Sequence, residues 1–159
     1  MKKIKKKFIF VSFIVIFSVL IDQASKIVAY IQKDTIGDGI QILDFFNIVY
    51  VENKGISFGI FSSLDASFYL GILSFLISGY IIFIIKLSKE FWEIFGLSLI
   101  LGGAIGNGLD RVINNYVIDF LDFYINDYHW PAFNFADSFI TVGGIIFFWT
   151  ILKKNPEKK

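Results

Sequence analysis

The chain alternates between long apolar stretches and polar segments. Four apolar stretches stand out, at residues 8–31, 68–85, 91–109 and 135–152. Each is close to the roughly 20 residues that a helix needs to cross about 30 Å of hydrocarbon. Polar segments separate them, at residues 32–67, 86–90 and 111–134. We therefore predict an all-α membrane protein with four transmembrane helices, built as a single domain over residues 1–159.

The segment between the first two spans predicts a small β element. Residues 41–52 are rich in β-branched and aromatic side chains, residues 53–55 read Asn-Lys-Gly, and residues 56–61 are again apolar. Such a pattern around a turn signal is typical of a hairpin. We predict a hairpin or small sheet over about residues 40–61, lying on the outer membrane surface against lipid headgroups or substrate.

The basic residues predict the orientation in the membrane. Eleven of the fifteen fall at the N-terminus, in the short middle segment and at the C-terminus: Lys2, Lys3, Lys5, Lys6, Lys7, Lys86, Lys89, Lys153, Lys154, Lys158 and Lys159. The positive-inside rule makes both termini cytoplasmic and places the two longer segments outside. A basic start before an apolar run is also typical of a cleavable signal peptide. The length of the run, and DQASK in place of a small-residue cleavage pattern, favour an uncleaved span.

Composition narrows the possible chemistry. Hydrophobic residues make up 55% of the chain and charged residues 18%, and there is no cysteine. Disulfides, thiolate nucleophiles and thiolate metal sites are therefore excluded. With His129 as the single histidine, an HExxH zinc site is excluded and a histidine-based triad is disfavoured. Catalysis would have to use carboxylates, hydroxyls or lysine.

Polar residues inside the spans are the first candidates for a functional site. Asp22 and Lys26 lie one helical turn apart in the first span. A charge at the bilayer centre costs about 2.5–3.5 kcal/mol or more, so such residues usually face a protein interior. The alternative is a pair that snorkels at the helix end.

The end of the third span carries a second polar group. Asn107, Asp110 and Arg111 crowd one side of the helix, and we expect them to form a scaffold with Asp22 and Lys26. Gly102 and Gly106 form a GxxxG pattern, which we attribute to close helix packing.

Two further acids follow in the outer segment and at the fourth span. Asp119 has apolar neighbours in an extended-looking run, and Asp137 follows Asn134 by three residues. Asn134 and Asp137 also fit an ordinary helix cap, with an acid in the first turn. Asp122 and Asp127 look like exposed loop acids, although strand alternation does not separate Asp119 from Asp122.

Two carboxyls held close together can hydrolyse a peptide bond. Repulsion raises the pKa of one, so that a neutral acid and a carboxylate coexist near neutral pH. The helix dipole favours Asp137 as the carboxylate. The rivals are a Ser–Lys protease, with Lys26 and either Ser57 or Ser138, a transporter, and a membrane scaffold without activity.

These residues resemble the lipoprotein signal peptidase family. Five segments occur in the family's order along nearly the whole chain: DQASK (22–26), NKGISF (53–58), GGAIGNGLDR (102–111), VIDF (117–120) and FNFADS (133–138). The resemblance implies that Asp119 and Asp137 are the catalytic pair. It implies that the substrate site is shaped or supported by Asp22, Lys26, Asn53, Gly55, Asn107, Asp110, Arg111 and Asn134.

The resemblance also implies a reaction and a location. The chain would be an aspartic endopeptidase of the bacterial cytoplasmic (inner) membrane. It would cut prolipoproteins just before a cysteine that carries a diacylglyceryl group, using an activated water, with the outer hairpin over the site. We expect a monomer without cofactor or metal, in contact with substrate and membrane lipid but not with nucleic acid. Asn115 stands where the family usually has glycine, and Asn tolerates the left-handed backbone that this turn needs.

Overall fold

The computed structural model describes residues 2–55 and 66–154 of the chain. Within these residues, four helices are long and apolar enough to cross a membrane. They are α1 (Lys2–Ile31), α3 (Ser67–Leu87), α4 (Phe91–Asn114) and α5 (Phe135–Lys154). A short helix, α2 (Lys33–Ile36), follows α1. The four predicted spans are confirmed, and α4 continues five residues beyond the predicted end at residue 109.

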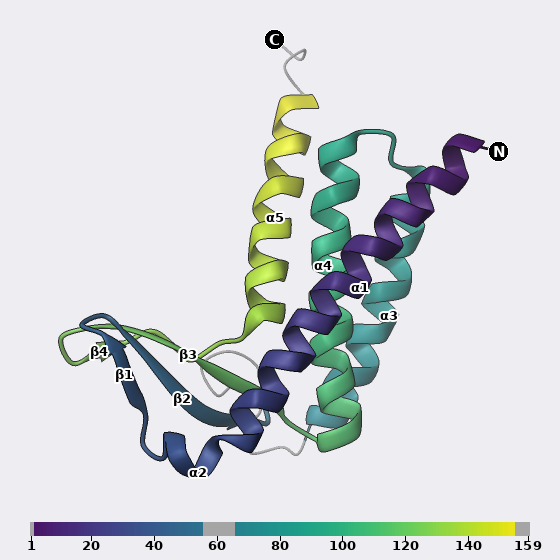
Figure 1. Cartoon of the computed structure of the whole chain (residues 1–159). Coiled ribbons are helices and arrows are strands. Elements are labelled where there is room, and N and C mark those ends of the chain that lie inside the picture. Colours follow the sequence, from purple (N-terminus) through teal and green to yellow (C-terminus); the bar gives the residue numbers. More distant parts are fainter. Residues whose placement is uncertain (1, 56–65, 155–159) are drawn as a thin grey trace.

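Helix α4 lies at the centre of the bundle and packs against α1, α3 and α5 (Figure 1). In its most apolar window 67% of the residues are buried, against 11–22% in the other three helices. Glycines allow the close approach: a Cβ at Gly102 would lie 2.6 Å from Ser18 of α1, and one at Gly96 would lie 2.7 Å from the Gly143 carbonyl of α5. Packing therefore explains the GxxxG glycines, and the outer helices turn their apolar sides outward, as hydrocarbon requires.

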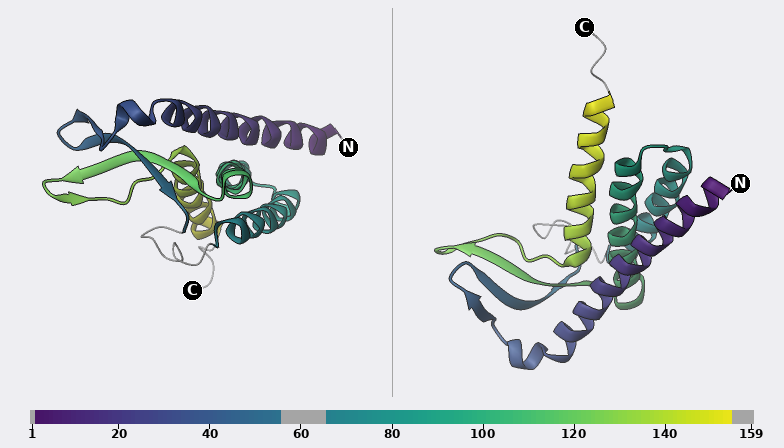
Figure 2. Two further views of the ribbon diagram at one scale, coloured as in Figure 1. Left: turned by 90° about the horizontal axis from the view of Figure 1, so that it is seen from below. Right: turned by 45° about the horizontal axis from the view of Figure 1, so that its top comes forward.

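A small antiparallel sheet projects sideways from the end of the bundle opposite the chain termini (Figures 1 and 2). Its described strands, in spatial order, are β1 (Ile40–Leu43), β2 (Phe46–Asn53), β3 (Val117–Ile125) and β4 (Tyr128–His129). The predicted sheet is confirmed, but its hairpin turns at residues 44–45, inside the stretch expected to be one strand. The expected second strand, residues 56–61, lies outside the described residues.

The two faces of the sheet differ chemically. On one face Val51 pairs with Asp119 and Phe46 pairs with Phe123, so an apolar surface runs outward from Asp119. The other face carries the buried Ile118 and Phe120 next to the bundle. Further out it carries Asp122, whose carboxylate accepts a hydrogen bond from Asn47 Nδ2 at 3.0 Å and lies 2.9 Å from His129 Nδ1.

The expectation that Asp122 is an exposed loop acid is wrong. It lies within β3 and is only 5% exposed, because its hydrogen-bonding partners cover it. Asp127, in the turn before β4, is exposed as expected.

The turn from α4 into β3 depends on Asn115. Its backbone is left-handed, with φ 63° and ψ 14°, and its N–H bonds to the Arg111 carbonyl at 3.1 Å. A left-handed residue after the last helical turn is a common way to end a helix. The expectation for Asn115 is confirmed, and this turn directs β3 back across the end of the bundle toward α5.

Candidate active site

Lys26 is the centre of a buried polar cluster between α1 and α4. Its side chain is 2% exposed, and its Nζ lies 2.8 Å from Asp22 Oδ2, 2.7 Å from Asp110 Oδ2 and 2.8 Å from Asn107 Oδ1. The contacts with Asp22 and Asn107 are hydrogen bonds, and the contact with Asp110 is an ion pair. The snorkelling alternative is therefore wrong, because the pair faces the interior of the bundle.

Asp22 extends this cluster to the start of α5. Its Oδ1 accepts a hydrogen bond from the Ala136 backbone N–H at 2.9 Å. A Cβ at Gly106 would lie 2.6 Å from Asp22 Oδ2, so the glycine leaves room for the carboxylate. Gln23, which the sequence analysis missed, donates to Asp110 Oδ1 at 3.0 Å. Its position between Asp22 and Lys26 in an otherwise apolar helix was the available signal.

Asn107 links this cluster to Asp137. Its Oδ1 accepts from Lys26 Nζ, and its Nδ2 donates to Asp137 Oδ1 at 2.8 Å. One amide therefore couples the scaffold on α1 and α4 to a carboxylate on α5.

Asn134 and Asp137 form a reciprocal helix cap at the start of α5. The Asp137 N–H donates to Asn134 Oδ1 at 3.0 Å, and the Asn134 N–H donates to Asp137 Oδ2 at 3.2 Å. The fully buried Asn134 also donates from Nδ2 to Asp119 Oδ1, at 2.6 Å. Capping and a role in the site are therefore compatible, because the cap fixes Asp137 beside Asp119.

Asp119 is held from its other side by the end of β2. Its Oδ2 accepts from Asn53 Nδ2 at 2.9 Å, and Asn53 Oδ1 accepts from the Gly55 N–H at 3.0 Å. Arg111 Nη2 donates to the Gly55 carbonyl at 2.9 Å. Residues Asn53 and Gly55 thus connect Asp119 to the last turns of α4.

The two aspartates have different electrostatic surroundings. Asp119 is 3% exposed, and this burial raises its pKa to about 7, with a further contribution from the negative charge of Asp137. Hydrogen bonds from Asn53 and Asn134 oppose the rise in the pKa of Asp119. Asp137 lies in the first turn of a helix and accepts hydrogen bonds on both oxygens, which stabilises a carboxylate. Asp119 can therefore keep its proton near neutral pH, next to a second carboxyl group that accepts hydrogen bonds on both oxygens.

Both aspartates line one cleft of about 790 Å³. Its walls come from α3, α4, β3, residues 130–133 and α5, and they are mainly apolar away from the two carboxyls. The lining includes Ser74, Ile77, Ile100, Ala104, Val117, Trp130, Pro131, Phe133, Ile140 and Thr141. Such a cleft can take an extended peptide next to apolar groups.

The sequence of this chain matches the model of the signal peptidase (SPase) II family over residues 14–153, a range that contains both aspartates. The chain belongs to the signal peptidase II family. It is a membrane aspartic peptidase, so the predicted enzyme class is confirmed.

Similar proteins support the same assignment. The chain is 43% identical over 136 residues to a lipoprotein signal peptidase of Thermodesulfovibrio yellowstonii, covering 85% of this chain and 89% of that protein. It is 43% identical over 132 residues to one of Cupriavidus taiwanensis, covering 80% and 74%. A bacterial membrane enzyme solved at 2.3 Å resolution is 32% identical, with a TM-score of 0.80 over 94% of this chain and 92% of that one.

The structure brings the predicted site residues together. Of the ten, Asp119 and Asp137 line the cleft with Asn53, Asn107 and Arg111. Gly55 and Asn134 bond to those residues, and Asp22, Lys26 and Asp110 form the cluster behind them. Among the described residues, no group of three or more His, Asp or Glu side chains is placed to hold a metal ion.

The Ser–Lys alternative fits the geometry poorly. Lys26 is fully engaged by the cluster, and Ser138 Oγ donates to the Asn134 carbonyl at 3.0 Å. Ser57 lies outside the described residues.

Proposed function

We propose that this chain removes the signal peptide from diacylglyceryl-modified bacterial prolipoproteins, cutting just before the lipidated cysteine. One observation carries the proposal: the amide of Asn134 bonds to Asp119 and caps the helix turn that holds Asp137, so both carboxyls face one cleft. The family supports signal-peptide cleavage as the reaction, and the membrane helices support a substrate that is itself anchored in the bilayer.

The carboxyl pair supplies both halves of the chemistry. Ionised Asp137 takes a proton from a water held between the carboxyls as that water attacks the scissile carbonyl. Neutral Asp119 donates a hydrogen bond to the developing oxyanion and later helps the amine to leave. The assignment follows from the raised pKa of Asp119 and from the hydrogen bonds that Asp137 accepts.

The proposed orientation puts this reaction on the outer face of the cytoplasmic membrane. Both termini and the α3–α4 connection lie at the end of the bundle opposite the sheet (Figure 1). Lys7 Nζ bonds to the carbonyls of Ile85, Lys86 and Ser88 at 2.9–3.1 Å, which joins the N-terminal basic cluster to this connection. The positive-inside rule makes that end cytoplasmic. The diacylglyceryl tails would lie in the bilayer beside the helices, and the enzyme would act as a monomer.

A direct test is incubation of the purified protein with a diacylglyceryl-modified prolipoprotein and with the same prolipoprotein without lipid. We expect cleavage of the lipidated form alone, and mass spectrometry should place the new N-terminus at the modified cysteine. Cleavage at another bond, or equal cleavage of both forms, would contradict the proposed substrate. Ser57→Ala and Ser138→Ala should each retain most of the activity, whereas the Ser–Lys alternative requires that one of them lose it.

A further inference from the structure

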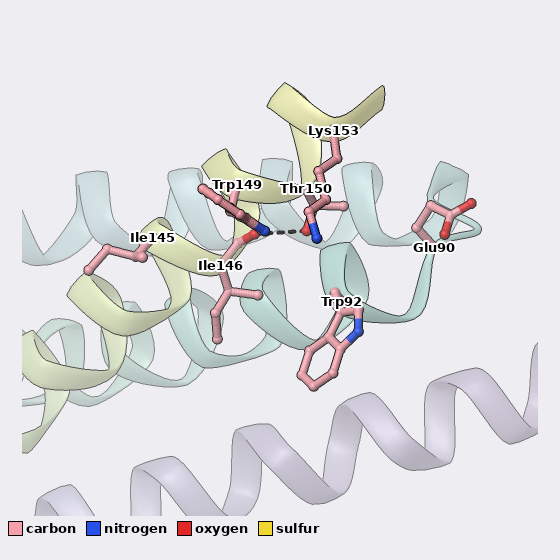
Figure 3. Close-up of a pocket in the computed structure, with 7 residues that line it drawn as sticks. All are labelled: Glu90, Trp92, Ile145, Ile146, Trp149, Thr150 and Lys153. Atoms are coloured by element: carbon pink, nitrogen blue, oxygen red, sulfur yellow. Dashed lines mark hydrogen bonds between the residues drawn. The ribbon is translucent and has the colours of Figure 1, made fainter. Parts of the chain in front are cut away.

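A second hollow, of about 910 Å³, lies at the opposite end of the bundle from the two aspartates. Its lining comes from the start of α4 and the last turns of α5: Glu90, Trp92, Ile145, Ile146, Trp149, Thr150 and Lys153 (Figure 3). The active-site cleft, in contrast, is lined by α3 and by the other end of α5. The hollow is therefore a separate feature that peptide cleavage does not use.

The hollow exists because α5 extends beyond α4. The two helices touch where Gly96 meets Gly143, and from there α5 runs about 16 Å to Lys154 while α4 runs about 8 Å to Phe91, at 1.5 Å per residue. Figure 1 shows α5 passing the start of α4. The last turns of α5 therefore extend past the first residue of α4, and α4 does not cover them.

The lining changes in character along the hollow in a fixed order. Ile145 and Ile146 lie furthest from the end of α5, toward the middle of the bundle. Trp149 lies one turn further along α5, and Thr150 and Lys153 follow toward the end of the helix. Figure 3 shows Ile145 at one end of the hollow and Glu90 at the other. From bilayer interior to water the order is thus hydrocarbon, aromatic, then charged, which is the order of tail, interface and headgroup in a phospholipid.

The charged end presents one cation and one anion. Lys153 Nζ lies 5.2 Å from the centre of the Trp149 ring, which holds the ammonium at the rim of the hollow. Glu90 ends the lining on the α4 side. A lysine ammonium is a good partner for a phosphate, and a carboxylate is a good partner for a primary ammonium. A headgroup that carries both, at the cytoplasmic surface, is complementary to this pair.

We propose that this hollow binds one inner-leaflet phospholipid with an ethanolamine headgroup. The acyl chains pack against Ile145, Ile146 and the tryptophan rings, the phosphate bonds to Lys153, and the ammonium bonds to Glu90. The inference rests on the proposed orientation, in which this end of the bundle faces the cytoplasm, and it goes beyond the proteolytic function.

The test is native mass spectrometry of the detergent-solubilised protein with phosphatidylethanolamine, phosphatidylcholine and phosphatidylglycerol of identical acyl chains. We expect phosphatidylethanolamine to be retained about fivefold more than the other two, since phosphatidylcholine lacks N–H donors and phosphatidylglycerol lacks the cation. Glu90→Gln should abolish that preference, and Lys153→Gln should weaken retention of all three lipids.

Lys89→Gln is the matched control, because Lys89 is exposed at the same end of the bundle but does not line the hollow. It should change nothing. Equal retention of the three lipids by the wild type, or equal losses in Lys89→Gln and Lys153→Gln, would overturn the proposal. We expect Glu90→Gln and Lys153→Gln to cleave the prolipoprotein at the wild-type rate. Loss of lipid retention by these variants would then be independent of the proteolytic site.

Discussion

Replacing Lys26 with Met tests the buried cluster that supports the active site. Methionine has nearly the length of lysine, so the change removes the charge and leaves most of the packing in place. Asp22 and Asp110, at 2.8 and 2.7 Å from Nζ, would then both lose the cation that they contact while remaining buried. Breaking a buried ion pair in this way costs about 3–5 kcal/mol.

That magnitude can be read from thermal unfolding in detergent. At about 2–4 °C per kcal/mol for a domain of this size, Lys26→Met should lower Tm by about 6–20 °C. The matched control is Lys33→Met, because Lys33 is exposed and its loss should change the free energy of unfolding by no more than about 0.5 kcal/mol.

The rate of substrate cleavage shows whether Lys26 only supports the active site or takes part in the reaction. Lys26 does not contact Asp137 directly but acts through Asn107 and through Asp22, which accepts from the Ala136 N–H. The Lys26→Met protein should therefore still cleave substrate slowly when it is assayed well below its Tm. A Tm within 2 °C of the wild type would refute the electrostatic role of Lys26. A complete loss of turnover by folded protein would mean that Lys26 takes part in the chemical step.

Three further predictions follow from the site. Because the neutral form of Asp119 is the acid and its pKa is about 7, kcat/KM measured against pH should fall about tenfold per unit above neutrality; a flat profile to pH 9 would contradict this. The same pKa, raised from 3.8, means that ionisation of Asp119 destabilises the fold as pH rises from about 4 to 7, so Asp119→Asn should gain thermal stability over the wild type at pH 8 but not at pH 4. Gly106→Ala should displace Asp22, which lies 2.6 Å from the added Cβ, and lower both Tm and activity, whereas Gly79→Ala, with open space around it, should not.

The sequence predicted the spans and the members of the site because each had a local signal. Apolar length identifies a membrane helix, and a charge within such a helix indicates a partner inside the bundle, as Asp22 and Lys26 have. The left-handed turn at Asn115 was expected because the family usually has glycine at this position and asparagine tolerates the same backbone.

The predictions that failed depend on contacts across the sheet. Asp119 and Asp122 lie on opposite faces of β3 and are both buried, by different partners: Asn53 and Asn134 for the first, Asn47 and His129 for the second. A single strand does not reveal which neighbours will cover it. The turn at residues 44–45 was missed for a similar reason, since pairing with β3 sets the register of β2.

Single-turnover cleavage of a diacylglyceryl-modified prolipoprotein by Asp119→Asn and Asp137→Asn tests the central claim most directly. Asp127→Asn, at an exposed turn, is the control, and size-exclusion chromatography with Tm establishes that each variant is folded. We predict that both site variants lose cleavage by about 10²–10⁴-fold while the control keeps the wild-type rate. A folded Asp119→Asn or Asp137→Asn protein that cleaves within tenfold of the wild-type rate would contradict the account.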